Sequence, residues 1–273
     1  MKADIPIIFE DANILVINKP AGLTVHGDGF GKQETLVDWL MKKYPEIEGV
    51  GEEMEPSTPL RHGFVGQRIK KPGIIHRLDK ETSGVMIVAK TQEAFLFFKK
   101  QFQNHEVKKI YRAILSGHVN FPVGEEKVLN WPIGRSSNDP RIRVARSGGK
   151  GKLREAVTIF RLLENICSNY ALVEAEPKSG RTHQLRAHFK AYNHPIIGDS
   201  LYNPNNNGEG AIERTALHAF SLTVKLPCFV ANSAEASLAK KTTQGEAKGE
   251  EMTFVAPLAS DFEAALEKLK ASC

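Results

Sequence analysis

Residues 74–91 read IIHRLDKETSGVMIVAKT, and this stretch decides how the rest of the chain is interpreted. Two apolar runs, Ile74-Ile75 and Val85–Ala89, enclose nine residues that are almost all polar. The pattern predicts two short strands joined by a polar loop that ends in glycine. Asp79 is the side chain in this loop that is best suited to act as a carboxylate nucleophile or base. The alternative is a charged surface turn, which composition alone would favour.

The loop His76–Gly84 has the sequence His-Arg-Leu-Asp-Lys-Glu-Thr-Ser-Gly. This sequence resembles, without a gap, the active-site motif of the RluA-type pseudouridine synthases. The resemblance implies that Asp79 is the catalytic nucleophile. It also implies that Arg77 helps to hold a flipped-out nucleotide, with His76 as a further RNA contact.

Two more segments resemble the same family. Asn18–His26 is similar to its opening motif, which supports the catalytic aspartate, and we expect a structural role for it. Lys109-x-Tyr111-x-Ala113 is similar to the family segment whose tyrosine packs against the target uracil. On pattern alone Tyr111 would be a core tyrosine of a strand.

A third segment, Ser179–Phe189, resembles the family motif Gly-Arg-Thr-His-Gln-Ile-Arg. The resemblance implies that Arg186 forms a salt bridge with Asp79, and we assign Arg181 to RNA or structural contacts. From the residues alone, Thr182 is expected to cap a helix. Arginines at the start of a helix are unfavourable for its dipole, so anionic partners are expected, either phosphates or carboxylates.

The net charge of +5 is concentrated in part of the chain. Between Arg135 and Arg154 there are seven basic residues and one acidic residue, and a second basic group is Arg68–Lys71. Each could be a solvated loop, but together they favour a track for a phosphate backbone. Arg141 and Arg143 are therefore candidate RNA contacts.

Composition excludes several classes of protein. Hydrophobic content is 41%, yet no stretch approaches the roughly 18 apolar residues of a membrane span. The N-terminal residues do not have the pattern of a signal peptide. Three cysteines without CxxC spacing indicate free thiols in a reducing compartment, and His183 and His188 are poorly spaced for a metal. We expect a cytoplasmic protein with no metal site.

The resemblance implies an α+β fold, with a central, mostly antiparallel mixed sheet flanked by helices and loops. RNA would lie in a cleft across the sheet. We expect residues 1–273 to form a single catalytic domain without an N-terminal S4 module, and residues 231–251 to be a flexible insertion. Helices are predicted at 34–44 and about 92–104, and antiparallel strands at Ala156–Leu163 and Tyr170–Glu176.

The function implied is that of an RNA pseudouridine synthase acting on ribosomal or transfer RNA after base flipping. Arg186 would keep Asp79 ionised, while Tyr111 and Leu185 would form a slot for the uracil. The reaction needs no cofactor, and we expect a monomer. The alternatives are a non-catalytic RNA-binding or ribosome-assembly factor and a nucleoside hydrolase. The latter would need a water-positioning site, which the sequence does not indicate.

Overall fold

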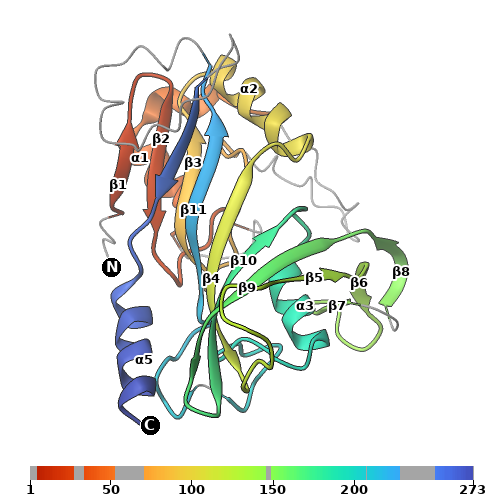
Figure 1. Cartoon of the computed structure of the whole chain (residues 1–273). Coiled ribbons are helices and arrows are strands. Elements are labelled where there is room, and N and C mark those ends of the chain that lie inside the picture. Colours follow the sequence, from red (N-terminus) through yellow and green to blue (C-terminus); the bar gives the residue numbers. More distant parts are fainter. Residues whose placement is uncertain are drawn as a thin grey trace. The chain divides into compact units, whose positions relative to one another are not determined.

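The computed structural model describes residues 5–27, 34–52, 71–145, 149–206, 208–227 and 250–272 (Figure 1). The chain forms two compact units. Unit 1 comprises Met1–Lys80, Val85–Val107 and Thr223–Phe254. Unit 2 comprises Glu81–Gly84, Lys108–Leu222 and Val255–Cys273. The single catalytic domain stays a prediction. The insertion expected at 231–251 lies almost entirely outside the described residues.

Unit 1 begins with a β-hairpin, which the apolar runs Ile7–Glu10 and Ile14–Asn18, separated by the polar Asp11-Ala12-Asn13, predict and the structure confirms. Strands β1 (Ile7–Glu10) and β2 (Ile14–Lys19) pair antiparallel around Asp11, whose Oδ1 accepts the backbone N–H groups of Asn13 and Ile14 at 2.7 Å. Strand β3 (Ser83–Ala89) lies next to β2. The strand predicted at residues 74–75 is wrong, because Ile74 forms only an isolated bridge with Val88.

The two helices predicted for unit 1 are confirmed. Helix α1 (Leu36–Lys43) begins with a capping box between Thr35 and Asp38, and a 3₁₀ turn, Pro45–Gly49, follows it. Helix α2 (Gln92–Gln103) begins where the side chain of Thr91 accepts the backbone N–H of Ala94. These caps satisfy donors that a helix start leaves unpaired, which is why such short polar signals locate the helices.

Unit 2 is built on a ladder of strands in the order β11-β4-β10-β9-β5 (Figure 1). Strands β4, β10, β9 and β5 pair antiparallel, which confirms the predicted hairpin of β9 and β10. The start of β3 pairs with β11 in parallel. Together with the helices, this mostly antiparallel sheet confirms the predicted α+β class. The strands of this ladder are β4 (Lys108–Ser116), β5 (Glu126–Asn130), β9 (Val157–Ile166), β10 (Tyr170–Pro177) and β11 (Leu217–Lys225). The last residues of β11, from Thr223, are counted with unit 1, as is most of β12 (Glu251–Val255), which pairs with β11.

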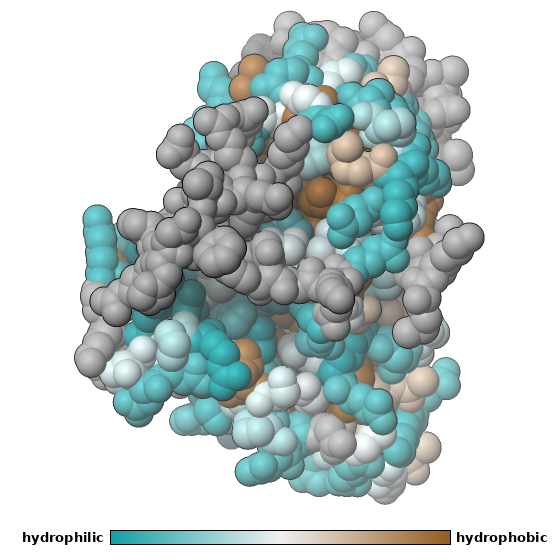
Figure 2. Space-filling model, turned by 180° about the vertical axis from the view of Figure 1, so that it is seen from behind, coloured by the Kyte–Doolittle hydropathy of each residue, from teal (hydrophilic) through white to brown (hydrophobic). Residues whose placement is uncertain are grey.

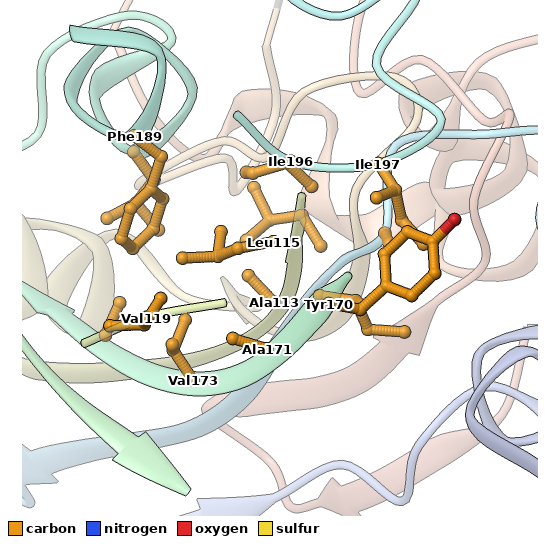
Figure 3. Close-up of a cluster of buried hydrophobic side chains, with 14 of the residues drawn as sticks. Ala113, Leu115, Val119, Tyr170, Ala171, Val173, Phe189, Ile196 and Ile197 are labelled. Carbon is orange, nitrogen blue, oxygen red and sulfur yellow. The ribbon is translucent and has the colours of Figure 1, made fainter. Parts of the chain in front are cut away.

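The core of unit 2 joins sheet and helices. Figure 3 shows Leu115 of β4, Val173 of β10 and Phe189 of helix α3 (Gln184–Ala191) pointing toward one another, with Ile196 beside them. Helix α5 (Ser260–Ala271) adds Phe262 and other apolar side chains to the same cluster. Burial of this apolar surface is the main favourable term that holds α3, and so Arg186, in place.

The basic stretch of residues 135–154 forms a second, three-stranded sheet, which the sequence analysis did not predict. Its strands are β6 (Ile133–Ser136), β7 (Arg143–Ala145) and β8 (Gly149–Arg154), in the order β7-β6-β8. We call residues 133–154 the basic arm. Arg135, Arg141, Lys152 and Arg154 are exposed on it, whereas Arg146 and residues 68–70 lie outside the described part of the chain.

Cys167 corrects one expectation. The residue is disulfide-bonded, whereas the sequence analysis expected free thiols. The cysteine occupies a left-handed backbone position, φ 51°, in the turn between β9 and β10. A disulfide depends on which cysteines lie close together in the folded chain, so cysteine count and spacing gave no sign of this bond.

The surface and the helices add two observations. Figure 2 shows that the described residues on one face present mainly hydrophilic side chains, with apolar ones scattered among them. Scattered apolar side chains of this kind are normal for a folded protein in water. Within the described ranges, no helix is both long and apolar enough to cross a membrane.

Buried His218 predicts a pH dependence of stability. Its Nδ1 lies 2.9 Å from Ser83 Oγ, and burial, reinforced by Arg214 and Arg112, lowers its pKa from 6.5 to about 4. The unfolded chain therefore takes up this proton first as the pH falls. The contribution of neutral His218 to the free energy of unfolding is fully present above pH 6.5. As the pH falls from 6.5 to about 4, this contribution, on the order of 3 kcal/mol, is lost.

Urea titrations at pH 7 and pH 4.5 check this, with His218→Gln as the comparison. The wild type is expected to lose more free energy of unfolding on acidification than the variant loses. Equal losses in both proteins would contradict the assignment of the acid transition to His218.

Candidate active site

The backbone beside Asp79 is held by the segment Asn18–His26. The carbonyl oxygen of Lys80 accepts the backbone N–H of Gly22 at 2.9 Å and the Nζ of Lys19 at 3.2 Å. Lys19 is fully buried, and its Nζ also donates to two carbonyl oxygens of its own turn, at 2.8 Å each. This agrees with the structural role expected for the segment. Asp79 itself is partly exposed.

Replacing Lys19 is expected to loosen this backbone. Lys19→Met keeps the length of the side chain but leaves three carbonyl oxygens without the ammonium donor. Each buried acceptor that loses its partner costs roughly 1–3 kcal/mol, so a total loss of about 3 kcal/mol in the free energy of unfolding is expected. Chemical denaturation measures it. A change below about 1 kcal/mol would show that the ammonium group does not hold the turn.

Arg77 has a partner that the sequence analysis did not predict. Its Nη1 lies 2.9 Å from Nε2 of His26. Burial lowers the pKa of His26, and the nearby cations Lys71 and Arg77 lower it further, although the carbonyl of Gly27 acts in the opposite direction. Neutral His26 can therefore accept the hydrogen bond from Arg77. The conformation holds an exposed arginine two residues from Asp79 in one place.

His76 is attached to neighbouring elements of unit 1. Its Nε2 accepts the backbone N–H of Ile87 at 3.1 Å, and its ring stacks on Phe102 at 4.5 Å. The ring therefore ties the loop to β3 and α2. Its role as an RNA contact stays a prediction.

The end of the loop, residues 81–84, belongs to unit 2 and is fixed there. Arg214 donates from Nη1 to the carbonyl oxygen of Glu81 at 3.2 Å, and binds Asp261 through Nε and Nη2 at 2.6 and 2.7 Å. Ser83 Oγ contacts His218 in the same unit. Residues 81–84 are thus held by polar side chains that are buried in unit 2.

Arg186 lies on α3 and is almost completely buried. Its Nε and Nη2 donate to the two carboxylate oxygens of Asp199 at 2.6 and 2.7 Å. Asp199 is not among the residues that the sequence predicts for the site. The predicted pairing of Arg186 with Asp79 joins unit 2 to unit 1 and stays a prediction.

The other predicted residues of unit 2 have the following positions. Tyr111 is half-buried on β4 opposite Ala175, and Leu185 is buried; both pack in the unit 2 cluster. Lys109 points to the same face of β4 as Tyr111, since side chains two residues apart share a face. Its Nζ lies 3.4 Å from the carbonyl of Ser179, and burial lowers its pKa.

Arg181 precedes α3 and donates from Nε to the carbonyl of Glu155 at 3.1 Å. The expectation that Thr182 caps the helix is wrong. The cap position is His183, at φ 55° and without a side-chain cap bond. Instead Gln184 turns back, and its Oε1 accepts the backbone N–H of Arg181 at 3.1 Å.

Two candidate RNA contacts, Arg141 and Arg143, lie on the basic arm. The exposed Arg141 pairs with Asp139 at 2.7 Å, and Arg143 donates to the carbonyl of Pro140 at 2.8 Å. Among the residues that the structure describes, no group of three or more His, Cys, Asp or Glu side chains is placed to hold a metal ion.

Comparisons with known proteins all find pseudouridine synthases. A family model described as RNA pseudouridylate synthase matches residues 13–191. An uncharacterized RNA pseudouridine synthase of Synechocystis is 33% identical over 267 residues, covering 97% of this chain and 68% of that protein. Ribosomal large subunit pseudouridine synthase D of Zymomonas mobilis is 35% identical over 228 residues, covering 80% and 65%.

Among solved structures, human RNA Pseudouridylate Synthase Domain Containing 4 is similar with a TM-score of 0.65 and 26% identity. The match covers 97% of this chain and 93% of that one. The curated relatives are longer than the matched part. The chain spans between 54% and 73% of their lengths.

Proposed function

This chain belongs to the family of RNA pseudouridylate synthases, and from that premise we propose that it isomerises specific uridines in RNA to pseudouridine through Asp79. The observation that carries the proposal is the position of Asp79. A partly exposed carboxylate stands on a loop whose backbone is fixed one residue later by Lys19 and Gly22. A nucleophile needs this combination of access and fixed geometry.

The chemistry makes limited demands. The bond from C1′ to N1 breaks, the uracil turns, and C1′ is rejoined to C5. C5 then gives up its proton and N1 takes up a proton, so there is no net oxidation or hydrolysis. Ionised Asp79 either adds to C1′ or removes the 2′ proton, and both routes begin from the same carboxylate. The proposed reaction uses no metal and no organic cofactor.

Unit 2 supplies the remaining groups in this proposal. The guanidinium of Arg186 forms a charge-assisted pair with Asp79, which favours the ionised carboxylate and holds it in one orientation. Tyr111 and Leu185 form the apolar slot in which the detached uracil turns. The half-burial of Tyr111 supports this, because its ring is anchored in the core and yet accessible at one side.

RNA is the proposed partner, held in a cleft across the sheet. Arg77, His76 and Arg181 would contact the flipped nucleotide and its neighbours, and Arg141 and Arg143 on the basic arm would contact phosphates. Flipping costs a few kcal/mol of stacking, which these contacts offset. The substrate is ribosomal or transfer RNA, and the protein acts as a monomer in the cytoplasm.

Incubation of the purified protein with RNA that lacks its modification tests the proposal. Total RNA from a strain without the gene serves as substrate, and pseudouridine is mapped at nucleotide resolution before and after. New pseudouridine at one or a few sites is expected. Tight RNA binding without new pseudouridine would overturn the proposal and favour a non-catalytic RNA-binding factor.

A further inference from the structure

Asp199 is a buried carboxylate with an unusually complete set of donors. It is fully buried, and it accepts Nε and Nη2 of Arg186 at 2.6 and 2.7 Å. The backbone N–H groups of Leu201 and Tyr202 donate to its Oδ1 at 3.0 Å. Four donors fix this carboxylate, so it can act as a rigid support for the arginine.

Tyr202, three residues later, holds Arg186 from a second side. The guanidinium carbon of Arg186 lies 4.9 Å from the centre of the Tyr202 ring, within the range of a cation–π contact. Tyr202 is itself buried, 3% exposed. Arg186 is thus held edge-on by a carboxylate and face-on by an aromatic ring.

The hydroxyl of Tyr202 extends this support to the basic arm. It accepts the backbone N–H of Arg143 in β7 at 2.7 Å and lies 3.1 Å from Nδ1 of His183. His183 stands at the start of α3, one turn before Arg186. A single phenol therefore links the arm, the helix start and the arginine.

We propose that Asp199 and Tyr202 are positioning residues, which hold Arg186 in its catalytic orientation and join it to the basic arm. This inference rests on the proposed function, since Arg186 acts on Asp79 there. A guanidinium has five N–H groups, and the pair with Asp199 uses only two of them. Asp199 can therefore fix the orientation of Arg186 without using all of its donors.

Tyr202 gives the arrangement a second consequence. When RNA phosphates bind to the basic arm, they fix β7. The backbone of β7 is hydrogen-bonded to the hydroxyl of Tyr202, and the ring of the same tyrosine contacts the guanidinium of Arg186. Binding on the arm and orientation of the arginine are then linked through one side chain. The expected signature of this link is a change in turnover rather than in RNA affinity.

Kinetics of Asp199→Asn test the first part of the proposal. Asparagine keeps the shape but loses the charge that pairs with the guanidinium. Because a small misplacement of a catalytic group can cost about 100-fold, kcat is expected to fall about 10- to 100-fold, with KM within about threefold. Tyr202→Phe keeps the ring and loses the hydroxyl, and should lower kcat about 3- to 10-fold, again with little change in KM.

Glu174→Gln is the matched control. It removes another ion pair of unit 2, between Arg161 on β9 and Glu174 on β10 at 2.7 Å. Its kcat should stay within about twofold of the wild type. If Asp199→Asn also keeps its kcat and only lowers the melting temperature, Asp199 is structural and the proposal fails. A rise in KM alone would likewise overturn it.

A double-mutant cycle tests whether Asp199 affects the reaction through Arg186 or independently of it. In an Arg186→Lys background, Asp199→Asn should lower kcat by less than about threefold further. A full additional loss would show that Asp199 acts independently of the arginine.

A readout that does not need turnover keeps this test apart from the proposed function. In the wild type the Nε–H resonance of Arg186, identified by its loss in Arg186→Lys, should be protected from exchange with water. Protection should be lost in Asp199→Asn and retained in Glu174→Gln. An inactive wild type with a protected resonance would refute the proposed reaction, whereas an unprotected resonance would refute the support by Asp199.

Discussion

Asp79→Asn is expected to abolish pseudouridine formation while leaving RNA affinity within about threefold of the wild type. Asparagine has nearly the same shape, but its amide is not a nucleophile or a base at neutral pH. Loss of a group that forms or breaks the reacting bonds typically lowers kcat by on the order of 10⁴-fold or more. Single-turnover assays, with pseudouridine quantified after digestion of the RNA, measure the loss.

Glu93→Gln serves as its control, because it removes an exposed carboxylate at the start of α2 in the same unit. Its rate should match that of the wild type. If Asp79→Asn retained more than about a tenth of the wild-type rate, the assignment of Asp79 as the nucleophile would be wrong. If it lost RNA binding as well, the variant would report on folding or binding instead of chemistry.

Gly84→Ala is expected to have the largest effect on stability. Gly84 ends the loop His76–Gly84 at φ +117°, a backbone conformation that residues with a side chain rarely adopt. A Cβ there would lie 2.2 Å from the carbonyl oxygen and 2.6 Å from the nitrogen of Ala219, its neighbour in the parallel ladder. Backbone atoms in a paired strand cannot move aside, so β3 and β11 would have to separate.

We expect Gly84→Ala to lose about 4 kcal/mol or more of the free energy of unfolding, or to fail to fold. Gly49→Ala is the control, since a Cβ at Gly49 meets nothing within 4 Å and its φ is not in the left-handed region. It should change stability by less than about 1 kcal/mol. Equal urea midpoints for the two variants would refute the close approach of β3 and β11.

Features determined by a few adjacent residues could be predicted from the sequence. The spacing of apolar residues predicts helices α1 and α2, and Thr35 and Thr91 cap these helices in the structure. The β1–β2 and β9–β10 hairpins follow from apolar runs separated by turn residues. The nine-residue loop with Asp79 indicated the family, because its amino-acid sequence is a specific motif.

Features that depend on distant partners could not be predicted. Asp199 is 13 residues from Arg186, and nothing in its own segment indicates that it is buried against an arginine. The fully buried Lys19 would be assigned to the surface by its residue type. The basic arm has few apolar residues. Its sequence therefore lacks the alternation of apolar and polar residues that would have predicted its three strands.

At the start of α3, the local preference of the residues and the contacts of the folded unit favour different helix caps. Thr182 has the residue type of a helix cap, yet the chain enters the helix through His183 in a left-handed conformation. The side chain of Gln184 is placed by Ser179, Thr158 and the carbonyl of Val157, which are contacts of the folded unit. Tertiary packing therefore overrides the local preference for a threonine cap.

The most direct test of the central claim is a map of pseudouridine across total cellular RNA in a strain that lacks the gene. The strain is complemented either with the wild-type gene or with Asp79→Ala. We predict that one or a few sites vanish in the deletion strain and return only with the wild type. Sites that also return with Asp79→Ala, or an unchanged map in the deletion strain, would contradict the account.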